Sequence, residues 1–180
     1  SAVPELLGTA GGSSLPNSSA ITFQLLDDTG HPLQGVVVTF ARNEQSDPTI
    51  VVQPNAVSDA GGNVTASLAS GTLPGPVTVI ATAVDNTTGN TVIGQSSVIE
   101  IVSGLPTFEK SFLLCGAVGV VAQPAPWSVT CAVDVVDKFT NGVDGVGVQF
   151  IAEAGNEAAA ATTAAGIASV SVASDATHGS

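Results

Sequence analysis

Residues 21–40 and 131–150 carry the same pattern of apolar and polar positions, and that pattern predicts one β-hairpin used twice. In the first copy, apolar and polar residues alternate from Ile21 to Leu25, which is the period of a half-buried strand. An Asp-Asp-Thr-Gly turn follows, and a second alternating stretch ends at Phe40. The copies align without a gap, and the matched pairs are Asp27 with Asp137, Gly35 with Gly145, Val36 with Val146, Val38 with Val148, and Phe40 with Phe150.

Further alternating stretches, bounded by Gly, Pro, Asp and Asn, predict more strands in the first part of the chain. We expect seven, over residues 3–7, 21–25, 35–40, 50–52, 63–69, 77–83 and 91–102. Turns that recur every ~8–12 residues are typical of a Greek-key β-sandwich. The fold class that we predict is therefore all-β.

The Ser-Gly-Leu-Pro stretch at residues 103–106 predicts a domain boundary, which gives a complete sandwich over 1–103 and a second one over 104–180. A short linker that contains Pro is stiff, so we expect the two domains to stack end to end. In the second domain we expect strands over residues 112–122, 129–137, 146–153 and 167–173.

The alignment of the two copies continues until Gly75 matches Gly179, and counterparts of residues 77–102 do not follow. Uncovering roughly half a dozen inward side chains, at ~1.5–3 kcal/mol each, costs on the order of 10 kcal/mol, as much as the stability of a typical domain. We therefore expect that the second domain, without its last two strands, does not fold alone. Either the chain is a piece of a longer protein, or another polypeptide supplies the strands by edge addition.

The composition agrees with this fold class and excludes two kinds of partner. Lys and Arg total 3 against 15 Asp and Glu, which gives a net charge of −12. Nucleic acid and anionic membrane surfaces both require clusters of basic residues, so we predict neither as a partner. The sequence also lacks an apolar run of about 18 residues, which a membrane-spanning helix would need.

Cys115 and Cys131 lie symmetrically about Gln123-Pro124, so antiparallel strands on either side would bring their sulfurs together. A disulfide there closes a loop of about 16 residues, is worth ~3 kcal/mol in the chain-entropy model, and requires an oxidising compartment. The alternative is a pair of reduced, buried thiols. Two cysteines without nearby histidines do not indicate a zinc site.

The sequence has no catalytic motif, so we predict neither an enzyme nor a cofactor. His31 and His178 are expected to be solvated. Structural calcium is the alternative reading of acidic residues near strand ends, namely Asp27, Asp28, Asp85, Asp134, Asp137 and Asp144, although their spacing is not that of a dedicated calcium loop. Trp127 is expected to cover one end of the sandwich, and a sugar-stacking role is its alternative.

The first hairpin and the stretch after it resemble the bacterial immunoglobulin-like repeat of group one, found in the invasin and intimin adhesins. The resemblance covers roughly residues 21–102 and rests on Asp27, Gly30, Pro32, Gly35, Val36, Val38 and Phe40, followed by Ser58-Asp59-Ala60-Gly61-Gly62. The second domain matches less completely, with Thr140 and Gly142 in place of Gly30 and Pro32. In it, residues 162–166 replace Ser58-Asp59-Ala60-Gly61-Gly62 and lack the aspartate.

The resemblance implies a non-enzymatic stalk or spacer of tandem immunoglobulin-like domains in an exported bacterial surface or adhesion protein. Its partners would be neighbouring repeats or identical subunits, and its location extracellular. One alternative is a self-assembling, pilus-like filament subunit whose second domain is completed by a strand from a neighbouring chain. A carbohydrate-binding module is the other alternative.

Overall fold

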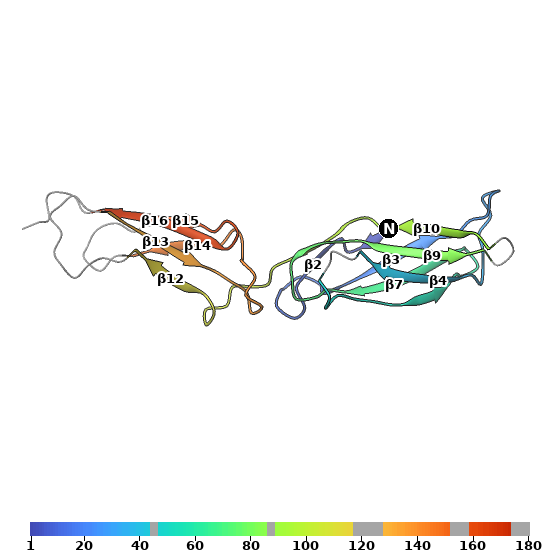
Figure 1. The fold of residues 1–180 in the computed structure, drawn as a ribbon, viewed down its shortest axis with the longest axis horizontal. Helices are drawn as coiled ribbons and strands as arrows, with labels where there is room; N and C mark the ends of the chain where they lie inside the picture. Colours follow the sequence, from blue (N-terminus) through green and yellow to red (C-terminus); the bar gives the residue numbers. More distant parts are fainter. Residues whose placement is uncertain (44–46, 86–88, 117–127, 152–158, 174–180) are drawn as a thin grey trace, which may run out of the picture. The chain divides into compact units, whose positions relative to one another are not determined.

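The computed structural model describes residues 1–43, 47–85, 89–116, 128–151 and 159–173 of the chain. The described residues form strands β1 to β16 and no helix, so they contain no helix able to cross a membrane. The prediction of an all-β fold is confirmed. The chain divides into two compact units, Ser1–Gly104 (unit 1) and Leu105–Ser180 (unit 2), and Figure 1 shows the strands of each.

The first layer of unit 1 is a four-stranded sheet in the order β1-β3-β7-β5. Its strands are β1 (Ala2–Val3), β3 (Ser18–Gln24), β7 (Asn63–Ala69) and β5 (Val51–Val52). Buried and exposed residues alternate strictly along β7, as expected for a strand with one face toward a core and the other toward water. The sequence predicted the ends of β7 correctly.

The second layer of unit 1 consists of two sheets whose strands alternate along the chain. One has the order β10-β9-β4-β6, with β10 (Thr91–Gln95), β9 (Val79–Val84), β4 (Val37–Arg42) and β6 (Asn55–Val57). The other has the order β2-β11-β8, with β2 (Leu6–Gly8), β11 (Ile99–Val102) and β8 (Gly75–Val77). The Ser96 hydroxyl, just after β10, accepts the N–H of Val79 at the start of β9.

The core of unit 1 lies between the two layers. The rings of Phe23 on β3 and Phe40 on β4 stack across it with centroids 5.9 Å apart. The fully buried apolar residues come from both layers and include Leu7, Ile21, Leu68, Val79, Ile99 and Ile101. Burial of a side chain of this size stabilises the fold by ~1.5–3 kcal/mol.

The seven strands expected in the first domain are an undercount, because the described residues of unit 1 form eleven. The single edge strand expected over residues 3–7 is wrong. The chain pairs with β3 through β1, passes a cis Val3-Pro4 peptide, and pairs with β11 in the other layer through β2. Strand β6 was not predicted, since Asn55–Val57 is too short to show a period.

Unit 2 repeats part of this plan. A three-stranded sheet has the order β12-β13-β16, with β12 (Phe112–Cys115), β13 (Ser128–Asp134) and β16 (Ile167–Ala173). A two-stranded sheet pairs β14 (Gly147–Phe150) with β15 (Ala159–Thr162). Residues 117–122, which were expected to extend β12, lie outside the described residues, as do 152 and 153 beyond β14.

Among the described residues, strand β14 of unit 2 has an edge that is paired in unit 1. Strand β4 lies between β6 and β9, whereas its counterpart β14 pairs only with β15 in the described part of unit 2. The counterparts of the buried Val38 and Phe40, which are Val148 and Phe150, are accordingly half-buried. The described strands of unit 2 thus match β1 to β7 in part, and none of them matches β9.

Candidate functional site

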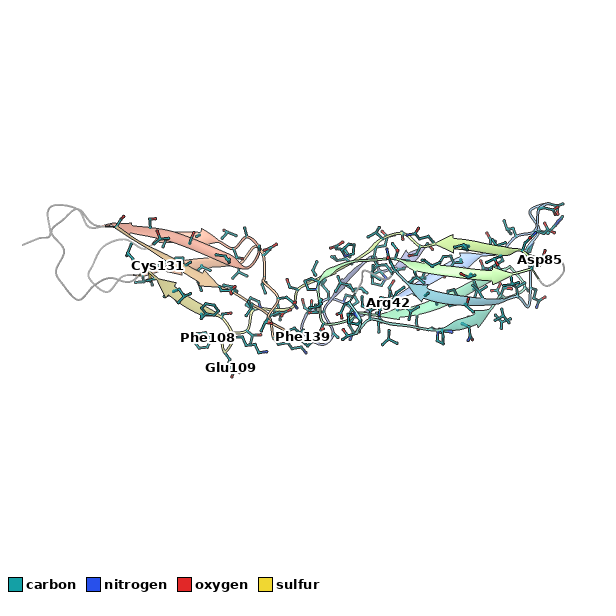
Figure 2. All side chains as sticks on the ribbon, viewed as in Figure 1. Arg42, Asp85, Phe108, Glu109, Cys131 and Phe139 are labelled. Carbon is teal, nitrogen blue, oxygen red and sulfur yellow. A yellow bond between two sulfur atoms is a disulfide. The ribbon has the colours of Figure 1, made fainter. Side chains whose placement is uncertain are left out.

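The sulfurs of Cys115 and Cys131 are joined in a disulfide that ties β12 to β13. The two cysteines are direct partners in the strand register, as Ala2 and Ile21 are in unit 1. Cys131 is 9% exposed and faces the core, whereas Cys115 is exposed on the edge strand. The disulfide therefore adds a covalent bond between the edge strand and its neighbour at the position where unit 1 has the apolar pair Ala2 and Ile21 (Figure 2, Cys131).

Asp27 and Asp137 close the same turn in the two units. The carboxylate of Asp27 accepts the N–H groups of Thr29 and His31, and the carboxylate of Asp137 accepts those of Phe139 and Asn141. Hydrogen bonds from the Thr29 hydroxyl and the His31 backbone lower the pKa of Asp27. Both aspartates therefore act as turn caps.

A buried hydroxyl fastens each hairpin to the following strand. In unit 1 the Ser58 hydroxyl donates to the Leu33 carbonyl at 2.6 Å and accepts the Val36 N–H at 3.0 Å. In unit 2 the Thr163 hydroxyl donates to Val143 at 2.6 Å and accepts from Val146 at 2.9 Å.

This arrangement corrects the sequence alignment, which matched Ser58 with Thr162. The backbone of Ser58 also exchanges hydrogen bonds with Gly35 and Val36, and Thr163 makes the same bonds with Gly145 and Val146. Thr163 is therefore the counterpart of Ser58, and the turn that follows it is one residue shorter than in unit 1. A gap of one residue between two short polar stretches leaves no signal in the apolar pattern.

Asp47 is a structural residue that the sequence did not single out. Its carboxylate accepts the Thr49 N–H and hydroxyl and the N–H groups of Thr72 and Leu73, which joins two loops of unit 1. Burial raises its pKa, but these hydrogen bonds outweigh that effect and lower the pKa to about 2. Asp47 also lines a hollow of about 440 Å³, and its carboxylate there already accepts the hydrogen bonds from Thr49, Thr72 and Leu73.

The described residues contain no group of three or more His, Cys, Asp or Glu side chains that could hold a metal ion. The six aspartates considered for calcium include Asp27 and Asp137, whose carboxylates are engaged as turn caps. His31 lies at the surface, within 3.7 Å of the Asp27 carboxylate. Trp127 and His178 lie outside the described residues.

The second strand of unit 1, β2, and its last strand, β11, form a parallel pair. Strand β2 pairs with β11 in the register Leu6 to Glu100, Leu7 to Ile101 and Gly8 to Val102. Two backbone bonds extend the ladder, from Glu100 to the Glu5 carbonyl at 2.8 Å and from Thr9 to the Val102 carbonyl at 3.0 Å. A pull on both ends of unit 1 draws these strands in opposite directions along their length, so the bonds between them are loaded together in shear.

We predict that Ser58→Ala destabilises unit 1 by about 1–3 kcal/mol, because it leaves the Leu33 carbonyl and the Val36 N–H without their partner. Ser58→Thr is the matched control and should retain most of the stability, since Thr163 makes the same contacts in unit 2. Urea denaturation of the full chain measures both changes. Equal stability of the alanine and threonine variants would contradict the role of the hydroxyl.

The lowered pKa of Asp47 predicts a pH dependence. Because its pKa falls from 3.8 to about 2 on folding, the stability that it contributes is complete above 3.8 and disappears as pH falls toward 2. Asp47→Asn should destabilise unit 1 at pH 7 and reduce the loss of stability between these two pH values. Urea midpoints at several pH values test this, with the exposed Asp28→Asn as a control of equal charge change. An unchanged pH profile in Asp47→Asn would count against it.

Neither a protein-family model nor a curated protein matches this chain. Among solved structures, the chain is similar to FdeC, described as a broadly conserved Escherichia coli adhesin eliciting protection against urinary tract infections, with a TM-score of 0.57 and 14% sequence identity. The match covers 94% of this chain and 52% of that chain, so this chain spans about half the length of its structural neighbour. The likeness shows the fold, which is all-β and built of immunoglobulin-like sandwiches.

Proposed function

We propose that this chain is a non-enzymatic stalk or spacer segment in an exported bacterial surface or adhesion protein. The parallel pairing of β2 with β11 is the observation that carries the proposal. A stalk transmits force between its ends, and strands loaded in shear resist that force better than strands whose hydrogen bonds break one at a time. Leu7 and Ile101, one on each strand, are buried beneath the pair and resist its sliding.

The disulfide of unit 2 supports the same role. Strand β12 is the first strand of unit 2, so a pull from the N-terminal side reaches it before the others. The Cys115–Cys131 bond passes that force directly to β13 and prevents the residues between the two cysteines from being extended. Disulfides persist in oxidising compartments, which agrees with an extracellular location.

The structural neighbour also supports the proposal. FdeC is described as an adhesin, and the chain matches about half of it in fold. A net charge of −12 keeps the surface of the chain soluble and repels copies of itself. Recognition of an adhesion ligand would then belong to other parts of the full protein.

Single-molecule stretching of the full chain from its two ends tests this function. We expect Glu100→Pro to lower the unfolding force of unit 1, because it removes the N–H that bonds to the Glu5 carbonyl in the sheared pair. Gln53→Pro is the matched control, since it removes one backbone bond, to the Ser67 carbonyl, away from the terminal pair. Equal unfolding forces in the two variants would contradict the proposal that the β2 and β11 pair resists the applied force.

The same experiment tests the disulfide. The two cysteines are 16 residues apart, so reduction should lengthen the extended chain by about 50 Å at ~3.3–3.6 Å per residue. Cys115→Ser with Cys131→Ser should show the longer extension without reductant. If the extension did not change on reduction, the Cys115–Cys131 disulfide would not be transmitting the applied force.

A self-assembling filament subunit is the second candidate, and it is favoured by the edge of β14 that has no partner strand among the described residues. Near this edge, Ile151 is 77% exposed, and on β12 Leu113 is 58% exposed. A strand from a neighbouring copy could pair with β14 and cover apolar surface of this kind. Light scattering over a range of concentrations separates the candidates, because a folded monomer at high dilution would count against assembly.

A further inference from the structure

The end of unit 1 that carries Leu26 is less covered than the corresponding end of unit 2. We call this surface the Leu26 pole and define it by the residues Leu25, Leu26, Leu33, Val36, Val84 and Val92, which line a hollow of about 290 Å³ together with Ala83 and Asp85. Figure 2 labels Asp85 at this end of unit 1. Leu26 is 48% exposed and Leu33 is 38% exposed, whereas their counterparts Val136 and Val143 are buried.

In unit 2 the segment that leads from the linker into β12, residues 105–113, is hydrogen-bonded to both backbone groups of Val136, the counterpart of Leu26. The Thr107 N–H donates to the Val136 carbonyl at 2.8 Å, and the Ser111 hydroxyl accepts the Val136 N–H at 3.1 Å. Lys110 donates from its ammonium group to the Lys138 carbonyl. The backbone N–H and carbonyl of Leu26, by contrast, have no hydrogen-bond partner among the described residues of unit 1.

The strand register shows where such a segment would enter unit 1. In unit 2, Phe112 to Cys115 pair with four consecutive residues of β13. In unit 1 only Ala2 and Val3 pair with β3 as strand residues, and Ser1 adds backbone bonds to Thr22. Ser1 corresponds to Leu114, so a segment like 105–113 placed directly before Ser1 would continue along β3 and reach Leu26.

We infer that the Leu26 pole is a docking surface for the linker of a preceding immunoglobulin-like unit in the same polypeptide, with the chemistry of residues 105–113. A hydroxyl side chain would accept the Leu26 N–H, and a backbone N–H would donate to its carbonyl. A lysine at the place of Lys110 would meet Asp28, the counterpart of Lys138, and so would have opposite charge beside it. This inference rests on the proposed function, because it requires tandem units.

The test fuses a copy of residues 105–113 directly before Ser1 of the full chain. We expect amide hydrogen exchange at Leu26 to slow at least tenfold, roughly the effect of one net hydrogen bond, and the unfolding midpoint of unit 1 to rise by at least about 4 °C. A graft of the same composition in scrambled order is the first control and should give neither effect. A graft whose copy carries Ser111→Ala is the second and should lose the protection of the Leu26 amide.

An unchanged Leu26 amide and an unchanged midpoint in the fused chain would overturn the inference. So would protection by an added synthetic peptide of residues 105–113 when the fused graft gives none, because the occupant would then come from another chain. Failure here is distinguishable from failure of the proposed function. Stretching tests the β2 and β11 pair, whereas the graft tests only the Leu26 pole.

Discussion

Each sheet of this fold has one apolar face, and the need to cover that face with the opposite sheet is the constraint on which the rest of the structure depends. In unit 1 the constraint is met across the whole interface, from the stacked rings of Phe23 and Phe40 to the buried side chains of Leu7 and Ile101. This packing is what joins strands β2 and β11 to the core. A stalk role therefore depends on the core as much as on the hydrogen bonds of the two strands.

Unit 2 shows what happens when the same constraint is met only in part. Strand β14 keeps one neighbour in the described residues, and Val148 and Phe150 are less buried than their counterparts in unit 1. The local elements are nevertheless retained, since the Asp137 turn and the Thr163 hydroxyl make the same bonds as Asp27 and Ser58. Turn chemistry acts over a few residues, so it persists where long-range packing is incomplete.

The two units also differ in how the first strand is held. Unit 1 places apolar Ala2 opposite Ile21, while unit 2 places a covalent bond at the same register position. The similarity to a solved structure at 14% sequence identity shows the fold, but it does not show how the first strand of each unit is held. This difference is seen when the two units are compared residue by residue, because equivalent positions in the strand register can then be matched.

The sequence by itself determined the all-β class, the repeated hairpin and the ends of β7, because each follows from a period of two. For the two cysteines it left a disulfide and a pair of reduced thiols as alternatives, and the structure joins them in a disulfide. Only the tertiary structure decided which sheet each short strand joins. It placed β2 parallel to β11, matched Thr163 with Ser58, and made Asp47 the link between two loops. These contacts join residues far apart in the chain, and the apolar pattern along a strand carries no information about a partner at that distance.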